Sequence, residues 1–146
     1  MKPRWYEIAE GEVGIKEIPG DKAEARIIEY HSHTTLKATS DEVAWCSAFV
    51  NFCVDRAGLK GTHSAAARSW LQWGVPVQPT EGCIVVMSRG SNPAQGHVGF
   101  YAGENASLVR ILGGNQHDSV CYSYFPKSHV LGYRWPEDMT TQEAAA

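Results

Sequence analysis

The 146-residue sequence lacks any apolar run long enough to cross a bilayer, so we expect no membrane insertion. Its first residues, MKPRWYEIAEGEVG, soon turn acidic and lack the apolar stretch of a secretory signal. It also lacks an excess of basic residues, since 13 lysines and arginines stand against 16 aspartates and glutamates, for a net charge of -3. This balance argues against nucleic acid as the main ligand.

Cysteine is scarce and scattered. The four cysteines form no C-x-x-C pair, and their spacing is unlike that of a zinc site: Cys46, Cys53, Cys83 and Cys121. Without an export signal we expect free thiols, although an even number leaves disulfides open. His31 and His33 form an i, i+2 pair that could bind a metal. No third ligand is near them in the sequence, so we expect both to be exposed polar residues.

The chain has no internal repeat and no long linker, and its length suits one domain. The first half has helical patterns at 4–14, 22–33, a segment that ends at Gly58, and 64–74. The second half has strand patterns at 83–88, 96–103, 107–114, 119–125 and 129–135. Short connections favour antiparallel hairpins. We predict an α+β fold, with N-terminal helices packed against a curved antiparallel sheet, in one domain (1–136) followed by a flexible tail (137–146).

The segment VAWCSAFVNF places Cys46 directly after Trp45 at the start of an apolar, helix-like run. Two helix starts are open. Ser40 and the two acids after it resemble an N-cap, which would put Cys46 in the second turn. A start near Trp45 would put Cys46 in the first turn, where free N–H groups favour a thiolate and can face an oxyanion. The run is apolar almost all round, which predicts a central helix with Cys53 in the core.

A cysteine nucleophile needs a base and a group that orients the base. Among the six histidines, His97 follows a glycine at the start of a strand and has room beside it for a substrate backbone. Asn115 follows two glycines at the end of the next strand, and its side-chain oxygen could set the tautomer of the imidazole. The order Cys46, His97, Asn115 predicts a thiol mechanism. Gln116 or His117 in place of Asn115, or a bare Cys–His dyad, remains open.

The segments EVAWCSAFVNFCVDRAGL, GHVGFYAG, and LGGNQ with VLGYRWP resemble the CHAP family, the cysteine, histidine-dependent amidohydrolases/peptidases, and in particular its small phage and prophage members. The resemblance implies a papain-like fold, related to the NlpC-type peptidases. It also implies cleavage of peptidoglycan at the N-acetylmuramoyl-L-alanine amide or within the peptide. On matching positions, Cys46 would be the nucleophile, His97 the general base and Asn115 the third member. Gly113 stands about where the family often has an acidic residue.

Four further residues are candidates for substrate binding. Trp45 and Trp70 could line the cleft and stack on sugar or peptide, with core packing as the alternative. Arg68 could pair with a carboxylate of the peptide stem, or be simply solvated. Tyr30, by its place ahead of the cysteine, could supply the second oxyanion donor. Some family members bind calcium through clustered aspartates, but the aspartates before Cys46 are isolated here, so we expect no metal and no cofactor.

We therefore expect a monomeric peptidoglycan hydrolase with a Cys-His-Asn mechanism, of the phage endolysin or virion-associated kind. Such a protein would be made in the host cytoplasm and would act in the periplasm or cell wall after holin-dependent release or injection. Three alternatives stand beside this expectation. They are a secreted antibacterial amidase toxin, a transglutaminase- or acyltransferase-like enzyme, and a non-catalytic wall-binding module.

Overall fold

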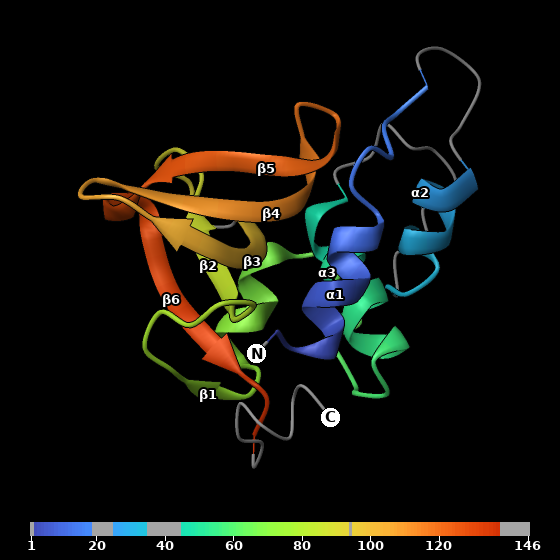
Figure 1. Cartoon of the computed structure of the whole chain (residues 1–146), viewed down its shortest axis with the longest axis horizontal. Helices are drawn as coiled ribbons and strands as arrows, with labels where there is room; N and C mark the ends of the chain where they lie inside the picture. The colour runs from blue at the N-terminus through green and yellow to red at the C-terminus, as the bar shows by residue number, and fades with distance from the viewer. Residues whose placement is uncertain (1, 19–24, 35–44, 94, 138–146) are drawn as a thin grey trace.

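The described part of the chain packs helices against one curved β-sheet. The computed structural model describes residues 2–18, 25–34, 45–93 and 95–137. In chain order its elements are α1 (Arg4–Gly11), α2 (Ala25–His31), α3 (Cys46–Arg56), the 3-10 helix η1 (Ala67–Gln72), β1 (Val75–Pro76), β2 (Ile84–Ser88), β3 (Gly96–Glu104), β4 (Leu108–Gln116), β5 (Ser119–Pro126), the 3-10 helix η2 (Lys127–His129) and β6 (Val130–Trp135). In Figure 1 the sheet lies on one side and the α-helices on the other. The predicted α+β class is confirmed.

Each strand of the sheet runs antiparallel to its neighbours. Within the described residues, six strands pair in the order β1-β6-β2-β3-β4-β5. Strands β2 to β5 follow one another as the predicted hairpins, whereas β6 returns to pair with β2, and β1 pairs with β6 at the edge. The return of β6 and the short β1 were not predicted, because local patterns do not record which distant strands pair.

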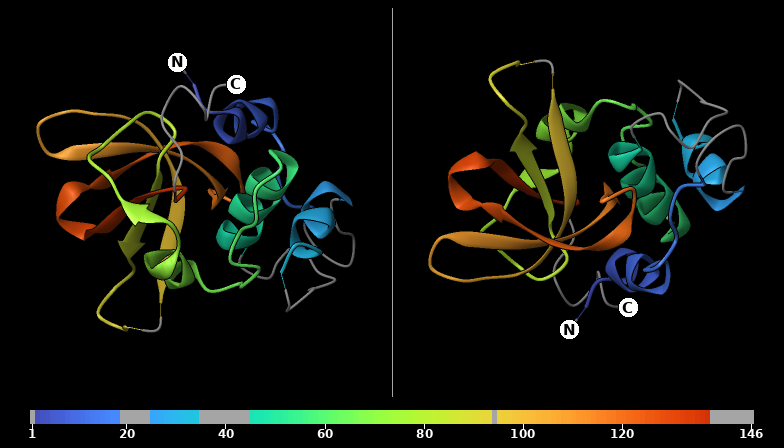
Figure 2. Two further views of the ribbon diagram at one scale, coloured as in Figure 1. Left: turned by 90° about the horizontal axis from the view of Figure 1, so that it is seen from below. Right: turned by 90° about the horizontal axis from the view of Figure 1, so that it is seen from above.

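Helix α3 is central to the described structure. Residues 46–54 are all buried. Phe49 packs against Phe100 of β3, with ring centroids 6.2 Å apart, and against Tyr30 of α2 at 5.2 Å. Figure 2 shows α3 between the sheet and α2. A helix that is apolar nearly all round must be covered on all sides, so the prediction of a central helix with Cys53 in the core is confirmed.

The start of α3 resolves the choice that the sequence left open. The helix begins at Cys46, and Trp45 is its N-cap residue, with φ -131 and ψ 19 and no side-chain capping bond. The ring of Trp45 stacks on Tyr30, with centroids 5.7 Å apart. Packing of this ring therefore sets the entry to the helix, and Cys46 lies in the first turn. The alternative cap at Ser40 lies outside the described residues.

The segment predicted as a fourth α-helix contains the 3-10 helix η1 instead. Its buried residues, Ala67 and Trp70, are three positions apart, which fits three residues per turn. The predicted tail (137–146) lies outside the described residues apart from Glu137. Within the described residues, no helix combines the length and apolar character needed to cross a bilayer.

Candidate active site

Cys46 lies at the N-terminal end of α3, at the edge of a hollow. Its side chain is 6% exposed. The hollow has a volume of about 230 Å³ and is lined by Cys46, Ala65, Ala66, Ala67, Arg89, Gln95 and Gly96. Phe49 donates its N–H to the carbonyl oxygen of Trp45 at 3.0 Å, and the N–H of Cys46 precedes this helical bond. First-turn N–H groups and the helix dipole stabilise a thiolate and an oxyanion at this point.

The Cys46 thiol is a stronger acid than an ordinary cysteine. Burial alone would raise its pKa, but a hydrogen bond and charge from His97, together with the charge of Arg89, lower this pKa below its usual value. Burial instead raises the pKa of Cys53 well above its usual value, and that of Cys83 to about 12. All four cysteines are free thiols, as predicted. A reactive thiolate is therefore favoured at Cys46 and disfavoured at the two core cysteines.

His97 is held in place from two sides. It lies near the start of β3, and its side chain is 2% exposed. Its Nε2 donates a hydrogen bond to Oε1 of Gln116 at 2.8 Å. The ring of Phe125 on β5 covers the imidazole at a centroid distance of 5.1 Å. The imidazole therefore has little freedom to turn away from the neighbouring thiol.

The amide of Gln116 determines which nitrogen of His97 carries the proton. The amide nitrogen of Gln116 donates to the carbonyl oxygen of Ile111 at 3.2 Å and to that of Cys121 at 2.7 Å. With both amide protons used, its Oε1 must accept, so Nε2 of His97 carries hydrogen. The buried Nδ1 of His97 makes no hydrogen bond of standard geometry with the described residues. It is the nitrogen left to take the proton of the Cys46 thiol.

Asn115, the predicted partner of His97, is not the residue that contacts it. Asn115 has a φ of 58, in the left-handed region where asparagine is more common than most residues. The register of β4 against β5 shifts between Gly113 and Gln116. This irregularity breaks the alternation of side chains, so Gln116 reaches the imidazole in place of Asn115. The prediction that Asn115 contacts His97 is therefore wrong by one position. The contact is made by Gln116, which the sequence left open as an alternative.

Gly113 makes room for the Gln116 amide. A Cβ atom on Gly113 would lie 2.6 Å from Oε1 of Gln116 and 3.5 Å from Nε2 of His97. A side chain at position 113 would therefore point into the space that the amide fills. The resemblance places the acidic residue of the family at about this position. In this chain the glycine leaves that space to the amide of Gln116, three residues further on, which supplies the acceptor.

A second hollow lies on the His97 side of the site. It has a volume of about 330 Å³ and is lined by Arg89, His97, Asn115, Gln116, His117, Ser123, Tyr124 and Phe125. Arg89 borders both hollows. Arg89 is not among the site residues predicted from the sequence. Its signal was its place directly after the predicted strand 83–88, which pairs with the strand of His97.

Three of the predicted substrate-binding residues are core residues. Trp45 and Trp70 are both 0% exposed, so neither ring offers a face to sugar or peptide. The indole nitrogen of Trp70 donates to the hydroxyl of Ser47 at 2.9 Å. Tyr30 is also fully buried, and its hydroxyl donates to Oε1 of Glu12 at 2.7 Å. The core-packing alternative fits the tryptophans, and the contact to Glu12 does not suit Tyr30 to hold an oxyanion.

Arg68 contacts the protein backbone. Its Nε donates to the carbonyl oxygen of Gln95 at 2.7 Å, and one terminal nitrogen reaches that of Asn92 at 3.5 Å. These bonds tie η1 to the segment that precedes β3. The guanidinium predicted to bind a substrate carboxylate is thus already used to hold the chain near His97.

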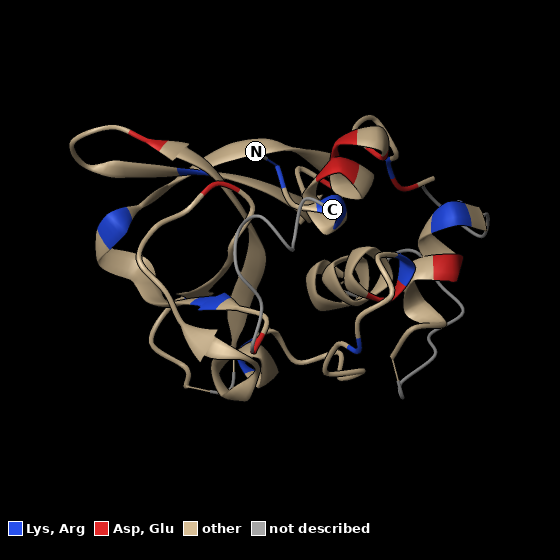
Figure 3. Cartoon of the chain, turned by 60° about the horizontal axis from the view of Figure 1, so that its bottom comes forward, with Lys and Arg blue, Asp and Glu red and all other residues tan. Residues whose placement is uncertain are grey.

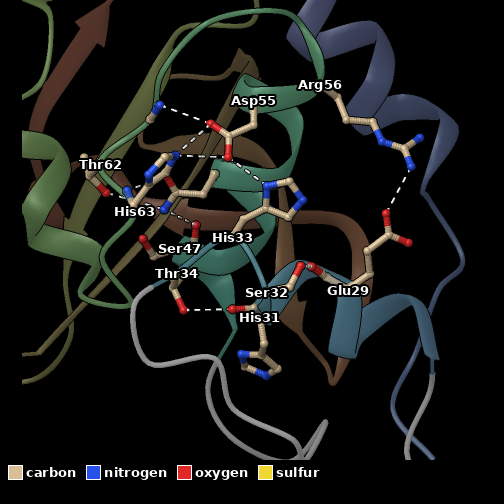
Figure 4. Close-up of polar contacts among 12 residues, drawn as sticks. Glu29, His31, Ser32, His33, Thr34, Ser47, Asp55, Arg56, Thr62 and His63 are labelled. Carbon is tan, nitrogen blue, oxygen red and sulfur yellow. Dashed lines mark hydrogen bonds and ion pairs between the residues drawn. The ribbon is translucent and has the colours of Figure 1, made fainter.

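A second group of histidines lies away from Cys46, around Asp55 of α3. Figure 4 shows Asp55 between His33 and His63. Nδ1 of His33 lies 2.7 Å from Oδ2 of Asp55, and Nε2 of His63 lies 3.1 Å from Oδ1. His31 is fully buried and His33 half-buried, so the expectation that both are exposed is wrong. Among the described residues, no group of three or more His, Cys, Asp or Glu could hold a metal ion.

An acidic thiol beside an oriented imidazole is the arrangement found in enzymes that attack a carbonyl group with a cysteine. Within that class the family is clear. Residues 38–115, more than half of the chain, match the family model of the CHAP domain, and the chain belongs to this family. CHAP domains are hydrolytic amidases and peptidases, and their substrate is peptidoglycan. Searches of curated proteins and of solved structures gave no significant match.

Proposed function

We propose that the protein hydrolyses an amide bond of peptidoglycan by a thiol mechanism that uses Cys46, His97 and Gln116. The observation that carries the proposal is the position of His97, whose Nε2 is bound by Gln116 while the Cys46 thiol interacts with the ring. Gln116 replaces the expected Asn115 as the orienting residue. We propose that the protein acts as a monomer, because the described residues supply each of these three parts from one chain.

The mechanism follows from the roles of these groups. Nδ1 of His97 takes the proton of the thiol, and the sulfur attacks the carbonyl carbon of the amide. The N–H of Cys46 donates to the oxyanion that forms. His97 then gives its proton to the leaving amine as the C–N bond breaks, which leaves a thioester on Cys46. Water, deprotonated by His97, hydrolyses the thioester and restores the thiol. Gln116 holds Nε2 throughout and stabilises the imidazolium between these steps.

The scissile bond is either the N-acetylmuramoyl-L-alanine amide or an amide within the peptide stem, because both suit a thiol nucleophile. We propose a phage or prophage lysin, either an endolysin or a virion-associated enzyme, on the resemblance to the small phage CHAP proteins. Such an enzyme acts in the periplasm or cell wall after a holin or an injection device lets it through the membrane.

Release of dye-labelled fragments from purified sacculi tests the proposed activity. We expect release by the unaltered protein and none by Cys46→Ala. Cys53→Ala is the matched control, since it removes a core sulfur seven residues further along the same helix, α3. It should keep activity and lose about 1 kcal/mol of stability. Activity of Cys46→Ala equal to that of the unaltered protein would refute the assignment of the nucleophile.

The proposed route to the wall has a test of its own. Purified protein is added to intact Gram-negative cells and to cells with a permeabilised outer membrane. We expect lysis of the permeabilised cells alone, because an enzyme of this kind relies on another device to pass the membranes. Rapid killing of intact cells by the protein alone would favour an externally acting toxin.

A further inference from the structure

Arg89 lies between the two hollows of the site. It directly follows β2, whose last residue, Ser88, pairs with Gly96 next to His97. One hollow contains Cys46 and the other contains His97, and Arg89 belongs to the lining of both. Because the sulfur attacks the carbonyl carbon and the imidazole protonates the amine, a substrate must lie across this junction. Arg89 is therefore within reach of groups next to the scissile amide.

The charge around Arg89 favours an anion. Of the described residues that line the two hollows, none is an aspartate or glutamate, and Arg89 alone carries a permanent charge. Arg89 is exposed, and it makes no hydrogen bond or ion pair with any residue that the structure describes. In Figure 3, basic and acidic positions are interspersed along the described chain. The positive charge at the junction of the two hollows therefore comes from Arg89.

Arg68 is nearby, but its contacts differ. Its guanidinium donates to the carbonyl oxygens of Gln95 and Asn92. The guanidinium of Arg89 has its donors available, and a planar fork of N–H groups matches a carboxylate with two parallel hydrogen bonds. Arg68 therefore holds the backbone before β3, whereas the donors of Arg89 are available at the junction of the two hollows.

We propose that Arg89 is a specificity residue that binds a free carboxylate of the substrate next to the scissile amide. The inference rests on the proposed function and narrows its substrate class to acidic peptide stems, in which that carboxyl group is not amidated. Amidation removes the negative charge and one acceptor oxygen. An amidated stem leaves the guanidinium with a neutral partner that can donate hydrogen bonds as well as accept them.

Alkylation of Cys46 tests the carboxylate site without any peptidoglycan. Iodoacetate and iodoacetamide react alike, since the thiolate forms a C–S bond and iodide leaves, but only iodoacetate carries a carboxylate. The ratio of their rates cancels any change in the thiolate fraction. We expect Arg89→Gln to lower the ratio of iodoacetate to iodoacetamide about five- to tenfold at low salt. Arg4→Gln, an equal charge change at an exposed position of α1, should leave it unchanged.

Peptide mapping reads the rates at Cys46 separately from the other cysteines, and equal circular dichroism spectra establish that both variants are folded. A ratio that Arg89→Gln leaves unchanged would overturn the proposal. A ratio that falls equally in Arg4→Gln would also overturn it, because the effect would then come from net charge.

Hydrolysis of paired muropeptides, acidic and amidated, tests the specificity itself. We expect the unaltered protein to prefer the acidic form in kcat/KM. Arg89→Gln should raise KM for the acidic form and remove the preference. Equal kcat/KM for the two forms in the unaltered protein would overturn the proposal. Absence of turnover on both forms would count against the proposed function, and the alkylation ratio would then decide the carboxylate site alone.

Discussion

The imidazole of His97 shows how one residue can be set for two tasks by its partners. Its Nε2 is tied to Gln116, whose amide protons are held by two backbone carbonyl groups. Nδ1 is thereby left with its lone pair for the thiol of Cys46. A neutral amide does this without adding a negative charge beside the site. The two hydrogen bonds that the amide nitrogen of Gln116 donates turn its oxygen toward His97. Gln116 rather than Asn115 is therefore the acceptor for the imidazole.

Substitution of the two neighbouring amides tests this division. We expect Gln116→Ala to lower kcat by roughly one to three orders of magnitude, because the imidazole loses its orienting partner while the nucleophile remains. Asn115→Ala, the matched control one residue away, should change kcat far less. Initial rates on soluble muropeptides over a range of pH measure both. A loss in Asn115→Ala as large as that in Gln116→Ala would contradict the assignment.

The space at Gly113 offers a rescue experiment. We expect Gly113→Asp, introduced into Gln116→Ala, to recover part of kcat, because a carboxylate at position 113 would point into the space vacated by the amide. An orienting carboxylate also favours the imidazolium, so the acid limb of the pH–rate profile should move upward. A merely structural role of Gln116 predicts no such recovery and no such shift.

The thiols differ enough in acidity to be told apart by reagent. Because the pKa of Cys46 is lowered, its alkylation by iodoacetamide should reach half of its maximal rate at a lower pH than that of a cysteine in the unfolded chain. His97→Ala should move that midpoint upward, because burial raises the pKa of Cys46 and the imidazole that lowers it is then missing. Cys53, whose pKa burial raises, should stay unmodified in the folded protein. A midpoint for Cys46 equal to that of the unfolded chain would contradict the account.

At this scale the sequence predicts the types of residue better than their contacts. Cys46 and His97 could be picked out because each stands at the start of an element, next to residues with a recognisable pattern. Gln116 could not, because a positive φ at Asn115 changes which side chain faces inward. The sequence around Trp45 and Trp70 does not show whether a tryptophan lines a cleft or fills a core. Their burial in the structure places both in the core.

Among the elements, the contact between α3 and β4 positions the site. Gly114 of β4 lies so close to α3 that a Cβ atom there would be 2.6 Å from the ring of Trp45 and 2.8 Å from Cβ of Phe49. This close approach brings the strand end that carries Gln116 toward the helix end that carries Cys46. The pair of glycines before Asn115 therefore serves the geometry of the site as well as the turn.

Gly114→Ala tests the importance of that approach. We expect it to destabilise the fold by roughly 1–3 kcal/mol, because a methyl group would press on the rigid ring of Trp45 and on Cβ of Phe49. Gly11→Ala is the control, since a Cβ atom there would meet nothing within 4 Å. Urea unfolding midpoints measure both. Equal stability of the two variants would show that α3 and β4 can separate without cost.

Most of the helices and strands could be predicted from the sequence. Alternation and turn residues marked β2 to β5, because both are local signals. The return of β6 to β2 joins strands far apart in the chain, so no local pattern recorded it. The start of α3 was ambiguous because capping preferences at Ser40 competed with the packing of Trp45, and packing determines where the described helix begins.

At the scale of the whole molecule, residues 38–115 match the CHAP domain, and the proposed site is assembled from one helix and one sheet. The thiol of α3, the imidazole of β3 and the amide of β4 meet where these elements converge. The described residues include no group suited to hold a metal ion. Acid–base chemistry at His97 and the N–H groups of α3 account for each step of the proposed mechanism.

Chelation and alkylation should therefore have opposite effects on the molecule. We expect a chelator to leave the rate of hydrolysis of sacculi unchanged and a thiol alkylator to abolish it. The measurement is dye release before and after each treatment. Inactivation by the chelator, reversed by calcium or zinc, would contradict a mechanism that needs only side chains of the protein.

Mass spectrometry of the fragments that the protein releases from purified peptidoglycan shows whether Cys46 cleaves an amide bond. We expect fragments with a newly formed carboxylate and a newly formed amine at one type of amide bond, intact glycosidic bonds, and no release by Cys46→Ser. Fragments cut at glycosidic bonds, or undiminished release by Cys46→Ser, would contradict it.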